Sequence, residues 1–188
     1  MRIISGKFKG KKIYEPKDKT TRPLKDLTKE SIFNVIEHSN KINVKIENSN
    51  ILDLFSGVGS FGLECLSRGA KNVYFVENYN DVVKILKKNI TSLRLEEYCY
   101  VINQNAFTGI DSRNFENNFD IVFLDPPYKE KNIHKMFTII HQEEILNKKN
   151  LVIIHRHKNE IESYPDYFQI QDKREYGISK IIFGCINY

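Results

Sequence analysis

Residues 50–62, NILDLFSGVGSFG, join a short apolar run to a glycine-rich turn. The run at residues 51–55 has the length and composition of a buried strand, and Gly57, Gly59 and Gly62 give the turn the spacing GxGxxG. A strand that leads into such a turn and then into a helix opens a doubly wound α/β sheet. The stretch therefore predicts the fold class and a ligand site at the carboxyl end of this strand.

Apolar runs alternate with helical patterns along the rest of the chain. Val82, Leu86 and Ile90, for example, recur at helical spacing between two of the runs. Strands so uniformly apolar indicate a parallel sheet that helices cover on both faces. A Tyr176-Gly177 turn between the last two runs predicts an antiparallel hairpin. The runs lie at residues 73–76, 98–102, 119–124, 150–154, 167–173 and 180–186.

The N-terminal part of the chain has a different pattern. Residues 26–38 place Leu27, Ile32, Phe33 and Ile36 at the spacing of one amphipathic helix. Residues 2–14 contain short β-like runs around two glycines and predict a small basic hairpin. The predicted architecture is α/β, a doubly wound Rossmann-like sheet, mostly parallel, with an antiparallel C-terminal hairpin. It divides into an N-terminal hairpin extension and a main domain, at residues 1–22 and 23–188.

Positive charge is concentrated in the first quarter of the chain. Residues 1–45 contain twelve Lys or Arg and five Asp or Glu, whereas the remaining residues contain seventeen and nineteen. Clustered cations favour a polyanion partner, because they displace counterions from phosphates. A solvated lysine-rich surface has the same pattern, so charge alone does not decide whether the protein binds nucleic acid. The candidate phosphate contacts are Arg2, Lys7, Lys9, Lys11 and Lys12.

Composition excludes several classes of protein. No window of about 18 apolar residues is present, so neither a membrane span nor a membrane partner is expected. The first residues lack the apolar stretch of a signal peptide. Cys65, Cys99 and Cys185 are scattered and lack CxxC spacing, which argues against a disulfide framework and a zinc site. A cytoplasmic protein without a metal site is therefore expected.

The glycine turn has two acidic neighbours that bear on its ligand. Glu77 ends the second predicted strand, 20 residues beyond Gly57, where a carboxylate binds the ribose hydroxyls of an adenosine. This spacing suits NAD and S-adenosylmethionine equally. Asp53 stands beside the turn, where it would repel a pyrophosphate but attract the sulfonium and ammonium of S-adenosylmethionine. A strand-end Asp that only caps the loop remains an alternative reading of Asp53.

A second motif, Asp125-Pro126-Pro127-Tyr128, follows the fourth predicted strand. Two prolines stiffen the backbone, so an Asp carboxylate and a proline carbonyl can accept the two hydrogens of an exocyclic amine. Tyr128 offers a flat face on which a base can stack. Such amines are poor nucleophiles, because the nitrogen lone pair is delocalised into the ring. Two acceptors favour a pyramidal nitrogen, whose lone pair can attack a sulfonium methyl group.

Together the motifs resemble those of the bacterial 16S rRNA guanine-N2 methyltransferases, of the guanine 966 type, which act on the small ribosomal subunit. The resemblance covers nearly the whole chain, and the N-terminal block and the Tyr-Gly turn make it more specific than the Asp-Pro-Pro-Tyr motif alone. The matching stretches are RIISGKFKGKKI at residues 2–13, the Thr-Arg-Pro of residues 21–23, and residues 29–34, 53–64, 67–70, 125–128 and 176–179.

The resemblance implies a role for each motif. S-adenosylmethionine is the implied methyl donor, and the basic N-terminal segment together with Arg22 is the implied RNA-binding surface. Asp125, Pro126 and Tyr128 are implied to be catalytic, and Pro127 to contact the substrate. The implied cofactor contacts are Asp53, Phe55, Ser56, Gly57, Gly59, Glu77, Asn105 and Ala106.

Five residues depart from the family pattern. Asn105 replaces an acid near the cofactor adenine, where its amide oxygen can still accept from the adenine amine. Leu24 and Leu27 replace more polar residues, and Ser179 replaces a Thr. His155 follows the fifth strand where an acid is common, and the run His-Arg-His that it begins is interpreted as a strand end rather than a metal site.

The sequence thus predicts a cytoplasmic, monomeric enzyme that methylates the N2 amine of a guanine in 16S rRNA, within a small-subunit ribonucleoprotein particle. A DNA or RNA methyltransferase that acts on adenine N6 or cytosine N4 is the first alternative. An NAD-dependent oxidoreductase and a non-enzymatic RNA-binding module are the remote ones.

Overall fold

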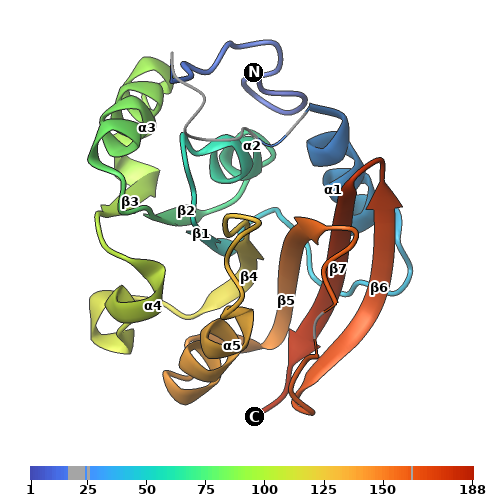
Figure 1. The fold of residues 1–188 in the computed structure, drawn as a ribbon. Helices are drawn as coiled ribbons and strands as arrows, with labels where there is room; N and C mark the ends of the chain where they lie inside the picture. The colour runs from blue at the N-terminus through green and yellow to red at the C-terminus, as the bar shows by residue number, and fades with distance from the viewer. Residues whose placement is uncertain (17–23, 25, 162) are drawn as a thin grey trace.

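The computed structural model describes residues 1–16, 24, 26–161 and 163–188. They form a seven-stranded sheet in the order β3-β2-β1-β4-β5-β7-β6 (Figure 1). The pairings from β3 to β5 are parallel, and β7 is antiparallel to both β5 and β6. This confirms the predicted doubly wound sheet with an antiparallel C-terminal hairpin. The strands are β1 (Asn50–Leu54), β2 (Asn72–Val76), β3 (Cys99–Ile102), β4 (Phe119–Leu124), β5 (Leu146–His157), β6 (Phe168–Tyr176) and β7 (Ser179–Ile186).

Helices cover both faces of the sheet (Figure 1). Three lie on one face, namely α1 (Asp26–His38), α2 (Ser60–Ser67) and α3 (Asn80–Leu93). On the other face lie α4 (Ala106–Gly109) and α5 (Ile133–Gln142). Two short 3-10 turns complete the chain, η1 (Glu96–Tyr98) and η2 (Ser112–Asn114). Within the described ranges, no helix is long and apolar enough to cross a membrane.

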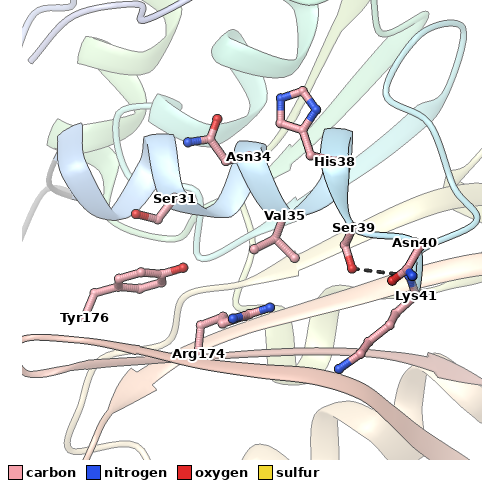
Figure 2. A pocket seen from close by; sticks show the side chains of 9 residues that line it. All are labelled: Ser31, Asn34, Val35, His38, Ser39, Asn40, Lys41, Arg174 and Tyr176. Atoms are coloured by element: carbon pink, nitrogen blue, oxygen red, sulfur yellow. Dashed lines mark hydrogen bonds between the residues drawn. The ribbon is translucent and has the colours of Figure 1, made fainter.

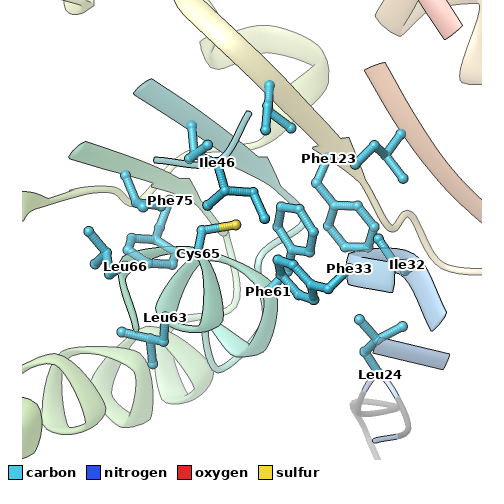
Figure 3. Close-up of a cluster of buried hydrophobic side chains, with 14 of the residues drawn as sticks. Leu24, Ile32, Phe33, Ile46, Phe61, Leu63, Cys65, Leu66, Phe75 and Phe123 are labelled. Atoms are coloured by element: carbon cyan, nitrogen blue, oxygen red, sulfur yellow. The ribbon is translucent and has the colours of Figure 1, made fainter. Parts of the chain in front are cut away.

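Each central strand contributes to two hydrophobic cores, because successive side chains point to opposite faces of a sheet. Phe123 of β4 belongs to the core under α1 and α2, and its neighbour Val122 to the core under α5. In the first core, the ring of Phe61 stacks on Phe123 at 4.1 Å and on Phe33 of α1 at 5.2 Å (Figure 3). This packing fixes α1 and α2 against the strand that leads to Asp125.

Helix α1 has the predicted bounds and buries Ile32, Phe33 and Ile36 as predicted, but its first turn differs. Leu27, expected in the apolar stripe, is 79% exposed, whereas Lys29 is fully buried. The Lys29 ammonium donates to the carbonyl of Arg2 at 2.7 Å and lies 3.5 Å from a carboxylate oxygen of Glu64 on α2. Burial lowers the pKa of Lys29, and the neighbouring Glu64 and Asp26 oppose that shift. A pattern based on hydrophobicity misses a lysine that a buried carboxylate compensates.

The basic N-terminal segment folds back on itself without forming regular strands. A single antiparallel bridge joins Arg2 to Lys12 within residues 1–16. The Ile3 and Ile13 N–H groups donate to the carbonyls of Lys11 and Met1 at 2.9 and 3.1 Å, so the predicted hairpin is present in a minimal form. It also docks on α2, because the Glu64 carboxylate accepts from the N–H groups of Ile4 and Ser5 at 2.7 and 2.9 Å. Arg22 and the proposed boundary after it lie outside the described residues, and that division stays a prediction.

Gly6 allows a close approach of this segment to α2. A Cβ at Gly6 would lie 1.8 Å from the carbonyl oxygen of Ser67, whereas a Cβ at Gly10 would meet open space, although both residues have positive φ. Gly10→Ala is expected to cost about 1–2 kcal/mol from backbone strain. Gly6→Ala is expected to cost about 1–3 kcal/mol more, because the segment must move away from α2. Urea denaturation of both variants checks this, and equal losses of stability would contradict tight docking.

Candidate active site

A cavity of about 440 Å³ opens at the carboxyl ends of the central strands. This is the edge at which doubly wound sheets bind ligands. Most of the predicted cofactor loop and the whole Asp-Pro-Pro-Tyr motif border it. The lining consists of Met1, Pro16, Leu24, Asp53, Phe55, Ser56, Gly57, Val58, Ser60, Phe61, Glu77, Asn78, Tyr79, Phe123, Asp125, Pro126, Pro127, Tyr128 and His155.

The glycine loop turns sharply at the end of β1. Phe55 has φ +59° and Gly59 has φ +84°, and a Cβ at Gly59 would lie 2.5 Å from a side-chain methyl of Leu86. The Ser56 N–H donates to the carbonyl of Val76 on β2 at 3.1 Å, so the loop crosses from one strand end to the next. The turn thereby brings Ser56 and Gly57 to the wall of the cavity.

Glu77 anchors this loop from the end of β2. One of its carboxylate oxygens accepts from the Gly57 N–H at 2.9 Å, and the other accepts from the N–H groups of Asn78 and Tyr79, each at 2.9 Å. The oxygen bonded to Gly57 retains one lone pair that a ribose hydroxyl can use. Glu77 therefore holds the loop in shape and can bind a ligand as well.

Asp53 is 1% exposed and belongs to the same cavity wall. Its carboxylate accepts from the Gly62 N–H in the first turn of α2 at 3.0 Å, so it also caps the loop. Burial raises the pKa of Asp53 well above its usual range, the bond from Gly62 opposes that shift, and the charges of Asp125 and Glu77 add to it. A cation in the cavity would relieve this unfavourable burial of charge.

The cavity is therefore suited to a cation. Asp53, Glu77 and Asp125 contribute three carboxylates, and the described lining residues include no Lys or Arg. A pyrophosphate would face uncompensated repulsion here, whereas a sulfonium or ammonium group would be attracted. The described lining thus argues against NAD.

The loop after β4 lines the cavity with hydrogen-bond acceptors, and a buried arginine holds its backbone in place. Arg156 is 1% exposed and lies beneath this loop, where it donates to the carbonyls of Pro127 and Glu130 at 3.2 and 2.5 Å. The hydrogen bonds of the described residues include none to the Pro126 carbonyl or to Asp125 Oδ2. Those two acceptors remain for a ligand. Sequence reasoning did not identify Arg156.

His155 is a second residue of the candidate site that the sequence analysis did not assign to it. Its Nδ1 lies 2.8 Å from Asp125 Oδ1, its Nε2 lies 2.9 Å from Ser179 Oγ, and its ring packs edge-on against Tyr128. His157 packs on Tyr128 in the same way. A usable signal was present, because two predicted strands end at residues 124 and 154. Aligning those ends, which pair in the sheet, places Asp125 beside His155.

Other predicted contacts lie away from the cavity lining. Asn105 Oδ1 accepts from the Phe107 N–H at 2.9 Å and caps α4, and Ala106 is buried in the core under that helix. Gly59 supports the loop from behind without lining the cavity. The five N-terminal cations are all exposed, and they lie on the segment whose Met1 and Pro16 reach the cavity.

A second hollow, of about 910 Å³, lies between α1 and β6 (Figure 2). Its Lys41 and Arg174 both pair with Asp172, at 3.7 and 2.9 Å, so their charges are partly neutralised. It lies away from the cavity with the predicted motifs. The residues that line it are Ser31, Asn34, Val35, His38, Ser39, Asn40, Lys41, Arg174 and Tyr176.

The chain is similar to proteins known as methyltransferases. It is 31% identical over 179 residues to ribosomal RNA small subunit methyltransferase D of Haemophilus influenzae, covering 95% of this chain and 90% of that one. The protein of that name from Escherichia coli is 29% identical over 154 residues, which cover 82% and 73% of the two chains. A solved methyltransferase structure from Escherichia coli matches with a TM-score of 0.82 at 25% identity, covering 98% and 96%.

A more distant structure shares the fold alone. It is an RNA methyltransferase from Salinibacter ruber in complex with S-adenosyl-L-homocysteine, with a TM-score of 0.64 at 13% identity over 86% of this chain and 92% of that one. The predicted class, an S-adenosylmethionine-dependent methyltransferase, is confirmed by the relatives. A family model described as Conserved hypothetical protein 95 matches residues 1–185, and the chain belongs to that family.

Proposed function

We propose that this protein transfers a methyl group from S-adenosylmethionine to the exocyclic N2 amine of a guanine, of the guanine 966 type, in 16S rRNA of the small ribosomal subunit. The observation that carries the proposal is one cavity that joins a cation-attracting loop to paired amine acceptors. The relatives named as small-subunit rRNA methyltransferases support the RNA substrate.

The cofactor end of the cavity is formed by the glycine loop. S-adenosylmethionine, when bound, supplies a methyl group on a positively charged sulfur. Asp53 attracts the positive charges of this ligand, and the free lone pair of Glu77 accepts from a ribose hydroxyl. Ser56 and Gly57, which line the cavity, pack against the cofactor beside them.

The substrate end is formed by the loop after β4. Asp125 Oδ2 and the Pro126 carbonyl accept the two hydrogens of the guanine amine, and Tyr128 packs against the base. As these bonds strengthen, the nitrogen becomes pyramidal and its lone pair is available for attack. The proton leaves after the N–C bond forms, when the methylated nitrogen is acidic and the Asp125 carboxylate or water can accept it.

The basic segment binds the RNA backbone in this proposal. Arg2, Lys7, Lys9, Lys11 and Lys12 are exposed, and the segment that carries them borders the mouth of the cavity. Cations at this place can hold phosphates on either side of a base that enters the cavity. A ribonucleoprotein particle is the proposed form of the substrate, and a monomer the proposed form of the enzyme.

Nucleoside mass spectrometry tests the proposal directly. Unmethylated 16S rRNA, both naked and in small-subunit particles, is incubated with the protein and S-adenosylmethionine that carries an isotope-labelled methyl group. Labelled N2-methylguanosine is the expected product. Labelled N6-methyladenosine or N4-methylcytidine would move the enzyme to the alternative class, because paired acceptors suit any of these amines. Absence of label in all of them would contradict methyl transfer to nucleobase amines.

The proposed phosphate contacts make a prediction about salt dependence. Lys9→Gln with Lys11→Gln is expected to flatten the slope of log affinity for RNA against log salt by about 0.7–0.9 for each phosphate that is no longer neutralised. The matched control replaces Lys148 and Lys149, which are also exposed but lie near the amino end of β5, at the opposite edge of the sheet. Binding titrations at several salt concentrations measure both slopes. Equal slopes for the two double variants would show that the segment does not bind phosphates.

A further inference from the structure

His155 lies between the proposed amine acceptor Asp125 and the hydroxyl of Ser179. The distances are 2.8 Å from Nδ1 to Asp125 Oδ1 and 2.9 Å from Nε2 to Ser179 Oγ. The residue is 6% exposed, yet it borders the cavity. Both ring nitrogens thus have a hydrogen-bond partner, Nδ1 at Asp125 and Nε2 at Ser179 of β7.

The partners determine where the imidazole carries its proton. An ionised carboxylate only accepts hydrogen bonds, so Nδ1 donates its hydrogen to Asp125. In the neutral ring, Nε2 then accepts from the Ser179 hydroxyl, which can rotate to donate. Asp125 therefore sets the tautomer, and Ser179 satisfies the nitrogen that remains.

We infer that His155 is a positioning residue for methyl transfer, an inference that rests on the proposed function. Its Nδ1–H holds Asp125 Oδ1, which leaves Oδ2 directed at the substrate amine. In the transfer step the amine lone pair forms the N–C bond while the C–S bond breaks and its electron pair goes to sulfur. The nitrogen proton then passes to Asp125 Oδ2 or to water, and His155 keeps its own proton throughout.

The same ring braces the proposed base platform. Tyr128 meets His155 edge-on, with ring centroids 6.0 Å apart. One imidazole therefore fixes both the acceptor and the aromatic side chain beside it. Small displacements of groups that contact reacting atoms can cost about 10²-fold in rate. Losing this ring should therefore affect the reaction more than it affects binding.

Two substitutions of similar size separate positioning from packing. Asn places an N–H close to the position of Nδ1, whereas Gln places its amide near Nε2, within reach of Ser179 but not of Asp125. His155→Gln is expected to lower the single-turnover rate by about 10–100-fold, and His155→Asn by less than about fivefold. KM for RNA and the Kd for S-adenosylmethionine should change by less than about threefold in both variants.

His134 provides a matched control. Its Nε2 lies 3.2 Å from Ser163 Oγ, so it is a histidine–serine pair outside the cavity lining. His134→Gln and His134→Asn should leave the transfer rate unchanged, and thermal melts of all four variants show whether folding is intact. If His155→Asn and His155→Gln lose rate equally, or if rate follows melting temperature, then His155 only packs and the inference is wrong.

Nitrogen NMR of histidine-labelled protein gives a readout that does not depend on activity. His155 is expected to show a protonated Nδ1 and an unprotonated Nε2, and Asp125→Ala, which removes the acceptor, should shift the balance toward the other tautomer. Ser179→Thr, which keeps the hydroxyl, should not. A protonated Nε2 with a bare Nδ1 in the parent protein would overturn the inference. If the parent transfers no methyl group to RNA, the proposed function fails while this spectrum still decides the hydrogen bonds.

Discussion

Asp125→Ala is expected to lower the single-turnover rate of methyl transfer to 16S rRNA by about 10²–10³-fold, the loss typical of removing one fixed polar group from an active site. The reason is that the hydrogen bond from the amine to Asp125 Oδ2 strengthens only as the nitrogen becomes pyramidal. Binding of S-adenosylmethionine should persist, because Asp53 and Glu77 remain. Rapid-quench measurements at saturating cofactor give the rate, and calorimetry gives the affinity.

Asp111→Ala is the control for this substitution. Asp111 forms an ion pair with Arg113 at 2.6 Å, and hydrogen bonds from Arg113 lower its pKa to about 2. It is an ionised Asp outside the cavity lining, so the transfer rate should be unchanged when it is removed. Near-normal transfer by Asp125→Ala would remove the carboxylate from the mechanism.

The second large effect is expected at Asp53, with opposite signs for binding and for stability. Asp53→Asn should weaken S-adenosylmethionine binding by about 10–100-fold, because a charge-assisted interaction contributes about 1.5–3 kcal/mol. The cofactor-free variant should nevertheless melt at a higher temperature than the parent near neutral pH, since it no longer buries a carboxylate. The Gly62 N–H keeps an acceptor in either case.

The pH dependence of this stability difference follows from the raised pKa. In the folded protein Asp53 holds its proton more tightly than in the unfolded chain, so the free energy of unfolding falls as pH rises from about 3.9 through the folded pKa. The variant lacks this titration. Its advantage should vanish in acid and grow with pH, as melting curves at several pH values would show. Undiminished cofactor affinity in Asp53→Asn would instead leave the carboxylate with a purely structural role.

The sheet and the position of the site could be predicted because buried parallel strands are uniformly apolar. Errors arose where polar residues enter such elements. The prediction starts β5 at residue 150, yet the strand begins at Leu146. The first residues were missed because Lys148 and Lys149 are exposed and lie beside a register shift, so their sequence resembles that of a loop. Lys29 is absent from the predicted apolar stripe, because a lysine is buried only with a partner and its partner Glu64 is 35 residues away in sequence.

Part of the candidate site could also be predicted, because apolar runs show where the strands end. Glu77 and Asp125 directly follow apolar runs and Asp53 lies near the end of one, so all three could be placed at strand ends, where the cavity lies. The role of His155 depends on a hydrogen bond between two strands, which a motif search along the chain does not detect. Asn105 was expected at the cofactor because it follows β3; its amide oxygen caps α4, and its contact with the cofactor stays a prediction.

The strand order bears on how the site assembles during synthesis. The cofactor loop lies between β1 and β2, which pair directly, so Asp53 and Glu77 can meet within 25 residues of chain. The substrate end requires β4 to join the other side of β1, β5 to follow it, and β7 to supply Ser179. Contacts that close long stretches of chain form slowly. A nascent chain can therefore form its cofactor loop before the carboxylate of Asp125 is held in place, and the substrate end is complete only after the later β6–β7 hairpin has been synthesised.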